Sequence, residues 1–187
     1  MSGSSDEKAR LRGEALARRD AMPETARIEA SLEVAERVVD ELSFDPSAVV
    51  SGFLPIRSEI DPRPLMAALA DRGARICVPA IVEDRLEFRE LVRGAPLVPQ
   101  GFGTYAPGEG TAVLRPTLML VPLAAFDRRC HRIGYGRGYY DRAIAALRPL
   151  ATVGLAFACL EVAAVPDEPH DVALDFVVTE SAIHRSA

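Results

Sequence analysis

The stretch that decides the fold is Val121–Arg142, VPLAAFDRRCHRIGYGRGYYDR. It begins as an apolar strand, passes through a loop with Gly134, Gly136 and Gly138 in alternation, and enters YYDRAIAALR, which reads as a helix. A strand, a glycine-rich loop and a helix N-terminus together form a phosphate-binding arrangement. Glycines let backbone N–H groups approach an anion closely, and the helix dipole adds positive potential.

Three arginines accompany these glycines, Arg129, Arg132 and Arg137. They favour phosphate binding over the alternative of a glycine-rich turn with solvated charges. The loop is not a P-loop, which ends in Gly-Lys-Ser/Thr, nor a dinucleotide fingerprint, whose spacing is Gly-x-Gly-x-x-Gly. The next apolar run also carries no acid before Glu161. The pattern therefore favours a nucleotide phosphate held in a different kind of loop.

Apolar patterning along the rest of the chain alternates between strands and helices. It predicts a three-layer α/β fold, Rossmann-like, with a central, largely parallel (mixed) sheet flanked by helices. Residues 94–113 are rich in Gly and Pro and are expected to form a long loop with room for a short strand. We expect one domain over residues 1–187, with residues 1–5 as a loose tail. The other predicted helices cover 6–21, 23–42 and 62–72, and the predicted strands cover 48–54, 75–81, 86–91, 117–126, 152–158 and 175–180.

Composition and charge argue against several classes of protein. A hydrophobic content of 49% with 26% charged residues is typical of a globular protein, and the net charge of −5 argues against nucleic-acid binding by charge alone. The longest apolar run, near Ala151–Leu160, is shorter than the ~18 residues of a membrane span. The start MSGSSDEKARLR has no apolar core typical of a secretory signal. We therefore expect a cytoplasmic monomer that binds small molecules, without nucleic-acid or membrane partners.

Three cysteines, Cys77, Cys130 and Cys159, are an odd number and widely spaced, which predicts free thiols in a reducing compartment. Cys77 and Cys159 lie in apolar, strand-like runs, where buried thiols are expected. The pair Cys130-His131 invites a metal or nucleophile interpretation. No second Cys or His lies nearby at a ligand spacing, so the sequence favours a structural cysteine there.

The glycine-rich segment resembles the signature of the 5-formyltetrahydrofolate cyclo-ligases (methenyltetrahydrofolate synthetases). The motif GYGRGYYDR and the preceding VPLAAFDRR carry this resemblance, and further segments extend it, in order, over nearly the whole chain. Each segment alone is weakly specific, whereas together they are strongly so. The further segments are KARLRGEALARRDAMP, with Lys8 and Arg12; GFLPIRSEIDPRPLMAAL, with Glu59; GFGTYAPGEG, with a Phe-Gly turn; and VGLAFACLEV with PDEPHDVALDFVVTE.

The resemblance implies a ligase that uses ATP to cyclise 5-formyltetrahydrofolate, polyglutamylated or not, to 5,10-methenyltetrahydrofolate. Such chemistry requires positive charge around the phosphates, Mg²⁺ and a dry pocket. The residues that the resemblance assigns fall into four groups. They are Lys8 and Arg137 for catalysis; Asp141 and Asp171 for Mg²⁺; Leu54, Glu59 and Tyr139 for folate; and Lys8, Arg12, Arg132, Gly134, Tyr135, Gly136, Arg137, Gly138, Tyr139 and Tyr140 for ATP.

Residue spacing supports part of this assignment and leaves structural alternatives for the rest. Lys8 is the one lysine among 22 basic residues, and it lies one helical turn from Arg12, so both can face one anion. Asp141 could instead cap its helix, His170-Asp171 could form a turn, and Glu59 could be a solvated carboxylate near a helix start. Of Tyr139 and Tyr140, we expect one to line the pocket and the other to pack in the core.

Two departures from the family pattern stand in the signature. Cys130 replaces the usual Gly of Arg-Gly-x-Arg, which could alter the turn before the loop, and Arg137 stands where Lys or Gly is more usual.

Three alternative functions remain open: a paralogue acting on another substrate, a non-catalytic interaction module, and an NAD-binding oxidoreductase. Glu59 argues mildly against the first. The complete set of Lys8, glycines and aspartates argues against the second, and the loop spacing argues against the third.

Overall fold

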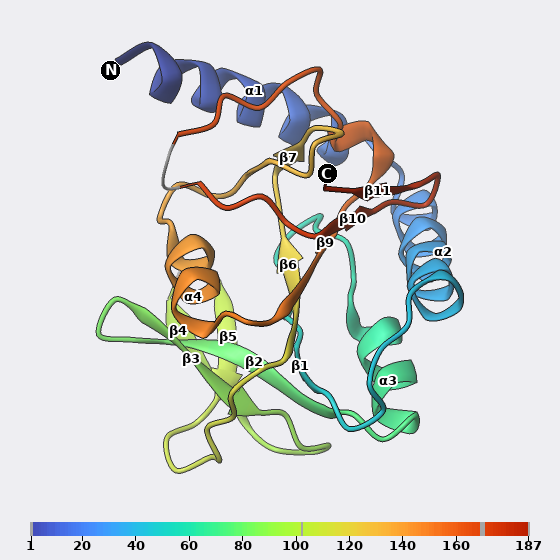
Figure 1. Ribbon diagram of the computed structural model, residues 1–187, viewed down its shortest axis with the longest axis vertical. Helices are drawn as coiled ribbons and strands as arrows, with labels where there is room; N and C mark the ends of the chain where they lie inside the picture. Colours follow the sequence, from blue (N-terminus) through green and yellow to red (C-terminus); the bar gives the residue numbers. More distant parts are fainter. Residues whose placement is uncertain (1, 102, 169–170, 187) are drawn as a thin grey trace.

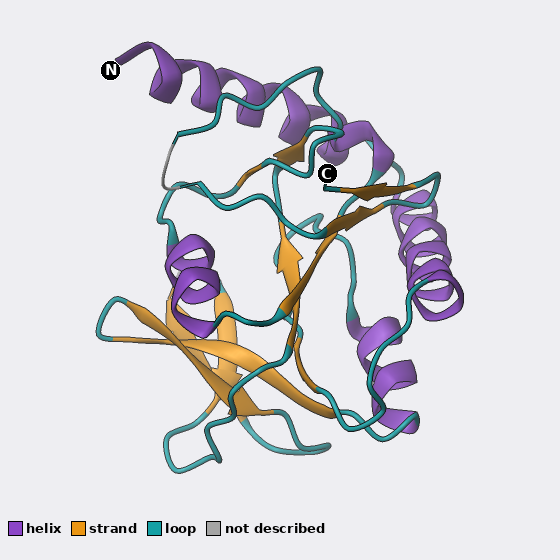
Figure 2. Ribbon diagram, viewed as in Figure 1, coloured by secondary structure: helices purple, strands orange, loops and turns teal. Residues whose placement is uncertain are grey.

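The structure, a computed structural model, describes residues 2–101, 103–168 and 171–186. Its centre is a seven-stranded, mostly parallel sheet between helices, which confirms the predicted α/β class (Figure 1, Figure 2). Helices α2 (Glu24–Glu41) and α3 (Arg63–Asp71) lie on one side of the sheet, and α4 (Tyr139–Leu147) lies on the other. Helix α1 (Ser2–Asp20) lies beyond the end of the sheet toward which strand β6 points.

The order of the strands indicates where ligands bind. The sheet runs β11-β10-β9-β6-β1-β2-β3, and only the edge strands β3 and β11 are antiparallel to their neighbours. Numbered along the chain, the five parallel strands follow the order 2-1-3-4-5, so the direction of winding changes between β1 and β6. Ligands of such sheets bind beyond the carboxyl ends of the strands at this switch point. The strands are β1 (Val49–Ser51), β2 (Arg75–Val82), β3 (Arg85–Glu90), β6 (Leu118–Pro122), β9 (Ala151–Leu155), β10 (Phe176–Val178) and β11 (Ile183–Arg185).

The core explains why these segments form these elements. Strand β6 buries its residues on both faces, as a parallel strand covered by helices must, and Leu118–Val121 are at most 2% exposed. Helix α2 turns its apolar stripe, which includes Val34 and Val38, toward the sheet. The Asp61 side chain accepts a hydrogen bond from the Arg63 backbone N–H at 3.0 Å just before α3, while the N-cap position itself is Pro62.

Several predicted boundaries are wrong. Helix α1 starts at Ser2, so residues 2–5 continue the helix instead of forming a loose tail; no proline interrupts them. Part of the predicted 94–113 loop is a hairpin of β4 (Leu97–Gly101) and β5 (Thr104–Pro107). The apolar run after β6 bends, and its end pairs as β7 (Ala125–Phe126) with β8 (Arg132–Ile133). Cys159 lies in the 3₁₀ turn η1 (Ala158–Leu160), not in a strand, and is only partly buried. The Phe102 of the Phe-Gly turn lies outside the described residues.

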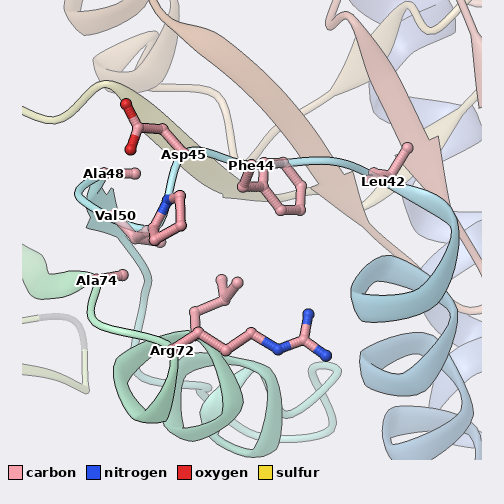
Figure 3. Close-up of a pocket in the computed structure, with 9 residues that line it drawn as sticks. Leu42, Phe44, Asp45, Ala48, Val50, Arg72 and Ala74 are labelled. Atoms are coloured by element: carbon pink, nitrogen blue, oxygen red, sulfur yellow. The ribbon is translucent and has the colours of Figure 1, made fainter.

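The opposite end of the sheet holds a small cavity of about 60 Å³ between the loop after α2 and helix α3 (Figure 3). Leu42, Phe44, Ala48, Val50 and Ala74 line it with apolar groups. It lies at the amino ends of β1 and β2, and a drug-sized ligand needs at least about 300 Å³. This end of the sheet is therefore structural. No helix among the described residues has both the length and the hydropathy to cross a bilayer.

Candidate functional site

The glycine loop (Gly134–Gly138) leads from β8 into α4 at the carboxyl end of the sheet. Gly136 and Gly138 have φ angles of 93° and 62°, a left-handed conformation that favours glycine. Gly138 is the N-cap of α4, so the unpaired N–H groups of the first helical turn point toward the loop. No side-chain hydrogen bond caps this terminus, so the capping role considered for Asp141 is not observed. A backbone that presents free N–H groups at a helix N-terminus can bind an anion.

Helix α1 brings two cations to this loop. The Arg12 Nε donates to the Gly134 carbonyl oxygen at 3.0 Å, and a Cβ on Gly136 would lie 3.9 Å from both terminal nitrogens of Arg12. The Lys8 Nζ lies 2.5 Å from the Asp171 Oδ2 and 3.8 Å from the Glu168 Oε2. The predicted Lys8 and Arg12 pair therefore faces the glycine loop and the C-terminal segment together.

Arg132 and Asp141 form an ion pair on the other side of the loop. The Arg132 Nη2 lies 2.7 Å from the Asp141 Oδ1, and the Arg132 side chain is only 4% exposed. The Arg132 Nη1 donates to the Val172 carbonyl at 2.6 Å, and the Val172 N–H lies 3.5 Å from the same Asp141 oxygen. Asp141 therefore lies beside the backbone that follows Asp171, so the two predicted metal ligands approach each other although 30 residues separate them.

The predicted turn at Asp171 coexists with its ion pair. The Asp171 N–H donates to the Glu168 carbonyl at 2.8 Å, and the Asp171 Oδ2 accepts from the Glu168 N–H at 2.9 Å. The turn holds the carboxylate toward Lys8. His170, the other member of the predicted turn, lies outside the described residues.

Asp141 and Asp171 are the side chains that the sequence predicts as metal ligands. Among the residues that the structure describes, no group of three or more His, Cys, Asp or Glu side chains is gathered for a metal ion. Mg²⁺ commonly uses only one or two carboxylates, with waters and substrate phosphates completing its shell. Two neighbouring carboxylates beside a phosphate loop suit that mode of binding, and they do not suit a cage made by the protein alone.

Glu59 meets the glycine loop through Tyr135. Glu59 follows β1, and its Oε2 accepts the Ile56 N–H at 2.9 Å. Burial raises the pKa of Glu59, although this bond and the nearby Tyr135 hydroxyl act to lower it. The Tyr135 oxygen accepts from the Arg19 Nη1 at 2.8 Å. Arg19, which is 3% exposed, also donates from Nε to the Ser58 Oγ at 3.0 Å.

The two tyrosines of the signature take different environments. Tyr139 lines a cleft of about 510 Å³ between α4 and β3, under the Arg142 guanidinium at 5.2 Å from its ring centre. Tyr140 packs against the hydrophobic core, and burial raises the pKa of its hydroxyl. Leu54, in the loop after β1, is half-buried and packs against the same core. The Arg137 side chain is exposed at the tip of the glycine loop.

Arg129, which the sequence grouped with the phosphate ligands, supports the turn before the loop instead. Its Nη2 lies 2.8 Å from Asp127 and 3.1 Å from Asp167 and donates to the Val165 carbonyl. Burial acts to raise the pKa of Asp127, but the Val165 N–H and Arg129 outweigh it, so this pKa is lowered. Arg129 is the charged partner of the buried Asp127, and a carboxylate that is 1% exposed requires such a partner.

Cys130 occupies a left-handed position in this turn, with a φ of 63°, which explains why a glycine is usual there. The residue is fully buried, and burial raises the pKa of its thiol to about 11. A thiol that stays protonated is a poor metal ligand or nucleophile, so the structural interpretation holds. Cys77 and Cys159 are free thiols as predicted.

The sequence interpretation overlooked two residues, Arg19 and Asp127. Arg19 had a detectable signal, because residues 8, 12, 15 and 19 follow the helical spacing of one face, and Ala15 on that face is fully buried. Asp127 had no detectable signal in the sequence, because an acid in an Asp-Arg-Arg turn is typical of a solvated loop.

Comparison with known proteins identifies the family. Residues 4–180 match the model of the 5-formyltetrahydrofolate cyclo-ligase family. A 5-formyltetrahydrofolate cyclo-ligase of Mycolicibacterium smegmatis is 30% identical over 92% of this chain and 93% of its own length. A 5-formyltetrahydrofolate cyclo-ligase of Escherichia coli is 28% identical over 89% of this chain and 96% of its own length.

Solved structures agree. The 5,10-methenyltetrahydrofolate synthetase of Aquifex aeolicus superposes with a TM-score of 0.82 at 27% identity, covering 95% of this chain and 92% of that one. The Mycoplasma pneumoniae 5,10-methenyltetrahydrofolate synthetase, at 22% identity and a TM-score of 0.75, shares the fold. The chain belongs to the 5-formyltetrahydrofolate cyclo-ligase family and is a ligase.

Proposed function

We propose that this ligase converts 5-formyltetrahydrofolate and ATP to 5,10-methenyltetrahydrofolate, ADP and phosphate. The observation that carries the proposal is the meeting of two elements at the switch point of the sheet. A phosphate-type glycine loop with Lys8 and Arg12 lies on one side, and the half-buried carboxylate of Glu59 lies on the other, with Arg19 in contact with both segments. The family-type signature, apart from Cys130 and Arg137, is present in the chain that forms this site.

The reaction must turn a poor leaving group into a good one. The formyl oxygen on N5 attacks the γ-phosphorus of ATP, and ADP departs with the electrons of the broken P–O bond. N10 then attacks the activated formyl carbon and loses its proton, and the C–O bond breaks as inorganic phosphate leaves. The protein's part is to align the formyl oxygen with the γ-phosphate and to surround the transferring group with positive charge.

Lys8, Arg12 and Arg132 are suited to hold the phosphates, but two of them have carboxylate partners in the structure. Lys8 is paired with Asp171, and Arg132 with Asp141. We infer that ATP exchanges these partners: the phosphates take the cations, and the two carboxylates turn to the metal that accompanies the nucleotide. Such an exchange avoids leaving a partly buried charge unpaired at any stage.

Asp141 and Asp171 are the side chains we assign to Mg²⁺. When bound with ATP, the ion would neutralise phosphate charge as it does in other phosphoryl transfers. Asp141 lies at the first turn of α4 and Asp171 beside Lys8, so both border the loop that we assign to the phosphates. The Arg137 side chain, exposed at the tip of the loop, is the remaining cation that we place on the transferred group.

Glu59 is the side chain we assign to the pterin of the folate. A carboxylate held by a backbone N–H retains lone pairs for the N–H donors of a pterin ring, and a partly desolvated acceptor discriminates for such donors. Tyr139, in the 510 Å³ cleft, offers an aromatic surface close to the loop. A paralogue for another substrate would lack a reason to keep a buried acid at this position.

The experiment that tests the function is direct. Purified protein is mixed with ATP, Mg²⁺ and 5-formyltetrahydrofolate, and the absorbance of the methenyl product is followed, with reactions lacking ATP or folate as blanks. We expect one ADP per methenyl group formed. ATP hydrolysis without the chromophore would indicate a paralogue with another substrate, and no reaction with either ligand would favour a non-catalytic module.

A further inference from the structure

We propose that Arg19 and Tyr135 are positioning residues that couple the two substrate subsites, so that folate bound at Glu59 tightens nucleotide binding at the glycine loop. The proposal rests on the function proposed above and goes beyond it, because neither side chain is required to touch a reacting atom. It follows from one guanidinium, that of Arg19, which contacts Tyr135 of the glycine loop and Ser58 next to the acid of the other subsite.

Tyr135 lies within the glycine loop, between Gly134 and Gly136. Gly136 needs its left-handed φ of 93°, and the Gly134 carbonyl is held by Arg12. The loop backbone on either side of Tyr135 is therefore committed to the geometry that presents N–H groups. The Tyr135 hydroxyl attaches this loop to Arg19.

The direction of the hydrogen bonds is fixed by chemistry. A guanidinium can only donate, so the Arg19 Nη1 must give its hydrogen to the Tyr135 oxygen over the 2.8 Å contact. The same guanidinium donates from Nε to the Ser58 Oγ at 3.0 Å, beside Glu59. Arg19 is therefore the donor toward both subsites, and its charge strengthens both hydrogen bonds.

Arg19 is held rigidly enough to serve as the anchor. Its side chain is 4% exposed, its Nε donates to Ser58, and Asp20 lies 3.7 Å away. Ser58 is the residue before Glu59, so one guanidinium contacts the Glu59 segment directly and the glycine loop through Tyr135. A ligand that fixes Glu59 therefore also fixes the loop, which lowers the ordering cost for the second ligand.

The prediction is a reciprocal change in affinity. In the unmodified protein, saturating 5-formyltetrahydrofolate should tighten a non-hydrolysable ATP analogue by about 5-fold or more, and the analogue should tighten the folate by the same factor. In Tyr135→Phe this coupling factor should fall toward one. Arg19→Lys, which keeps a charge but not the fork, should give an intermediate factor.

Isothermal titration calorimetry measures all four affinities, with Tyr105→Phe as the matched control, because Tyr105 is 50% exposed on β5 and also loses only a hydroxyl. A coupling factor of one in the unmodified protein overturns the proposal. So does a Tyr135→Phe protein in which both affinities weaken but the factor is unchanged, the result of a merely structural role. Methenyl formation by the unmodified protein is measured in parallel, so failure of the coupling is distinguished from failure of the function.

Discussion

The Glu59 segment (residues 52–60) and the glycine loop hold their acids in opposite ways. Glu59 is bound by a neutral backbone N–H, and its pKa is raised, whereas Asp141 and Asp171 are bound by Arg132 and Lys8 at 2.7 and 2.5 Å. An acid with neutral partners can accept further hydrogen bonds without giving up a counter-ion. Acids paired with cations can bind a metal only when another anion takes the cations. The Glu59 subsite can therefore accept its ligand as it stands, whereas the subsite with Asp141 and Asp171 must rearrange.

We expect the largest effect from removing Lys8, which is paired with Asp171. Lys8→Ala removes a cation that we assign to phosphate, and the loss should be about 2–4 kcal/mol of transition-state stabilisation, measured as kcat/KM for ATP. Arg10→Ala is the matched control, because Arg10 lies on the same helix but is exposed and pairs with Glu14. Equal kinetics in the two variants would remove Lys8 from the site.

Asp141→Asn tests the same side with a smaller change. The amide keeps the shape but loses a charge-assisted bond to the buried Arg132, which should lower the free energy of unfolding by about 1.5–3 kcal/mol. The Mg²⁺ concentration for half-maximal activity should also rise, since an amide is a poorer ligand than a carboxylate. Asp84→Asn, next to the exposed Arg142, is the control and should change stability by well under about 1 kcal/mol. An unchanged Mg²⁺ requirement in Asp141→Asn would contradict the metal assignment.

Glu59→Gln tests the Glu59 segment, the other region of the comparison. Gln can still accept the Ile56 N–H but loses the charge that strengthens bonds from pterin donors, so the KM for folate should rise about tenfold, or ~1.4 kcal/mol. The affinity for an ATP analogue alone, measured by calorimetry without folate, should stay nearly the same. Weakening of the nucleotide alone would reverse the placement of the two subsites.

The smallest effect is expected at Cys130, in the turn that supports the glycine loop. Cys130→Gly and Cys130→Ala both remove the thiol, but only glycine relieves the left-handed φ of 63°. We expect the Gly variant to be more stable than the Ala variant by about 1 kcal/mol in urea unfolding, against the usual order of the two residues. If the Ala variant were more stable than the Gly variant, the turn would have relaxed on substitution.

The sequence supports prediction of the fold class, and it groups the candidate site residues, for a physical reason. Glycines at a loop with Lys8 and Arg12 have a clear spacing, and parallel strands such as β6 are long apolar runs. The β4–β5 hairpin was missed because Gly and Pro mark turns and loops alike. The ion pairs Lys8–Asp171 and Arg132–Asp141, and the contact of Arg19 with Tyr135, join residues 163, 9 and 116 positions apart. Only the packed fold brings such partners together, and no local pattern encodes them.

Helix α1 is attached to the rest of the molecule mainly by its basic side chains. Ala15 is its one fully buried apolar residue, whereas Arg12, Arg18 and Arg19 donate to Gly134, Cys159 and Tyr135. An element with so little apolar burial belongs among the weakest cooperative units of a protein. The amides of α1 should therefore exchange with deuterium before those of the central strands, and bound nucleotide should slow them most. Arg12 thus both attaches this helix to the glycine loop and belongs to the phosphate site that we propose.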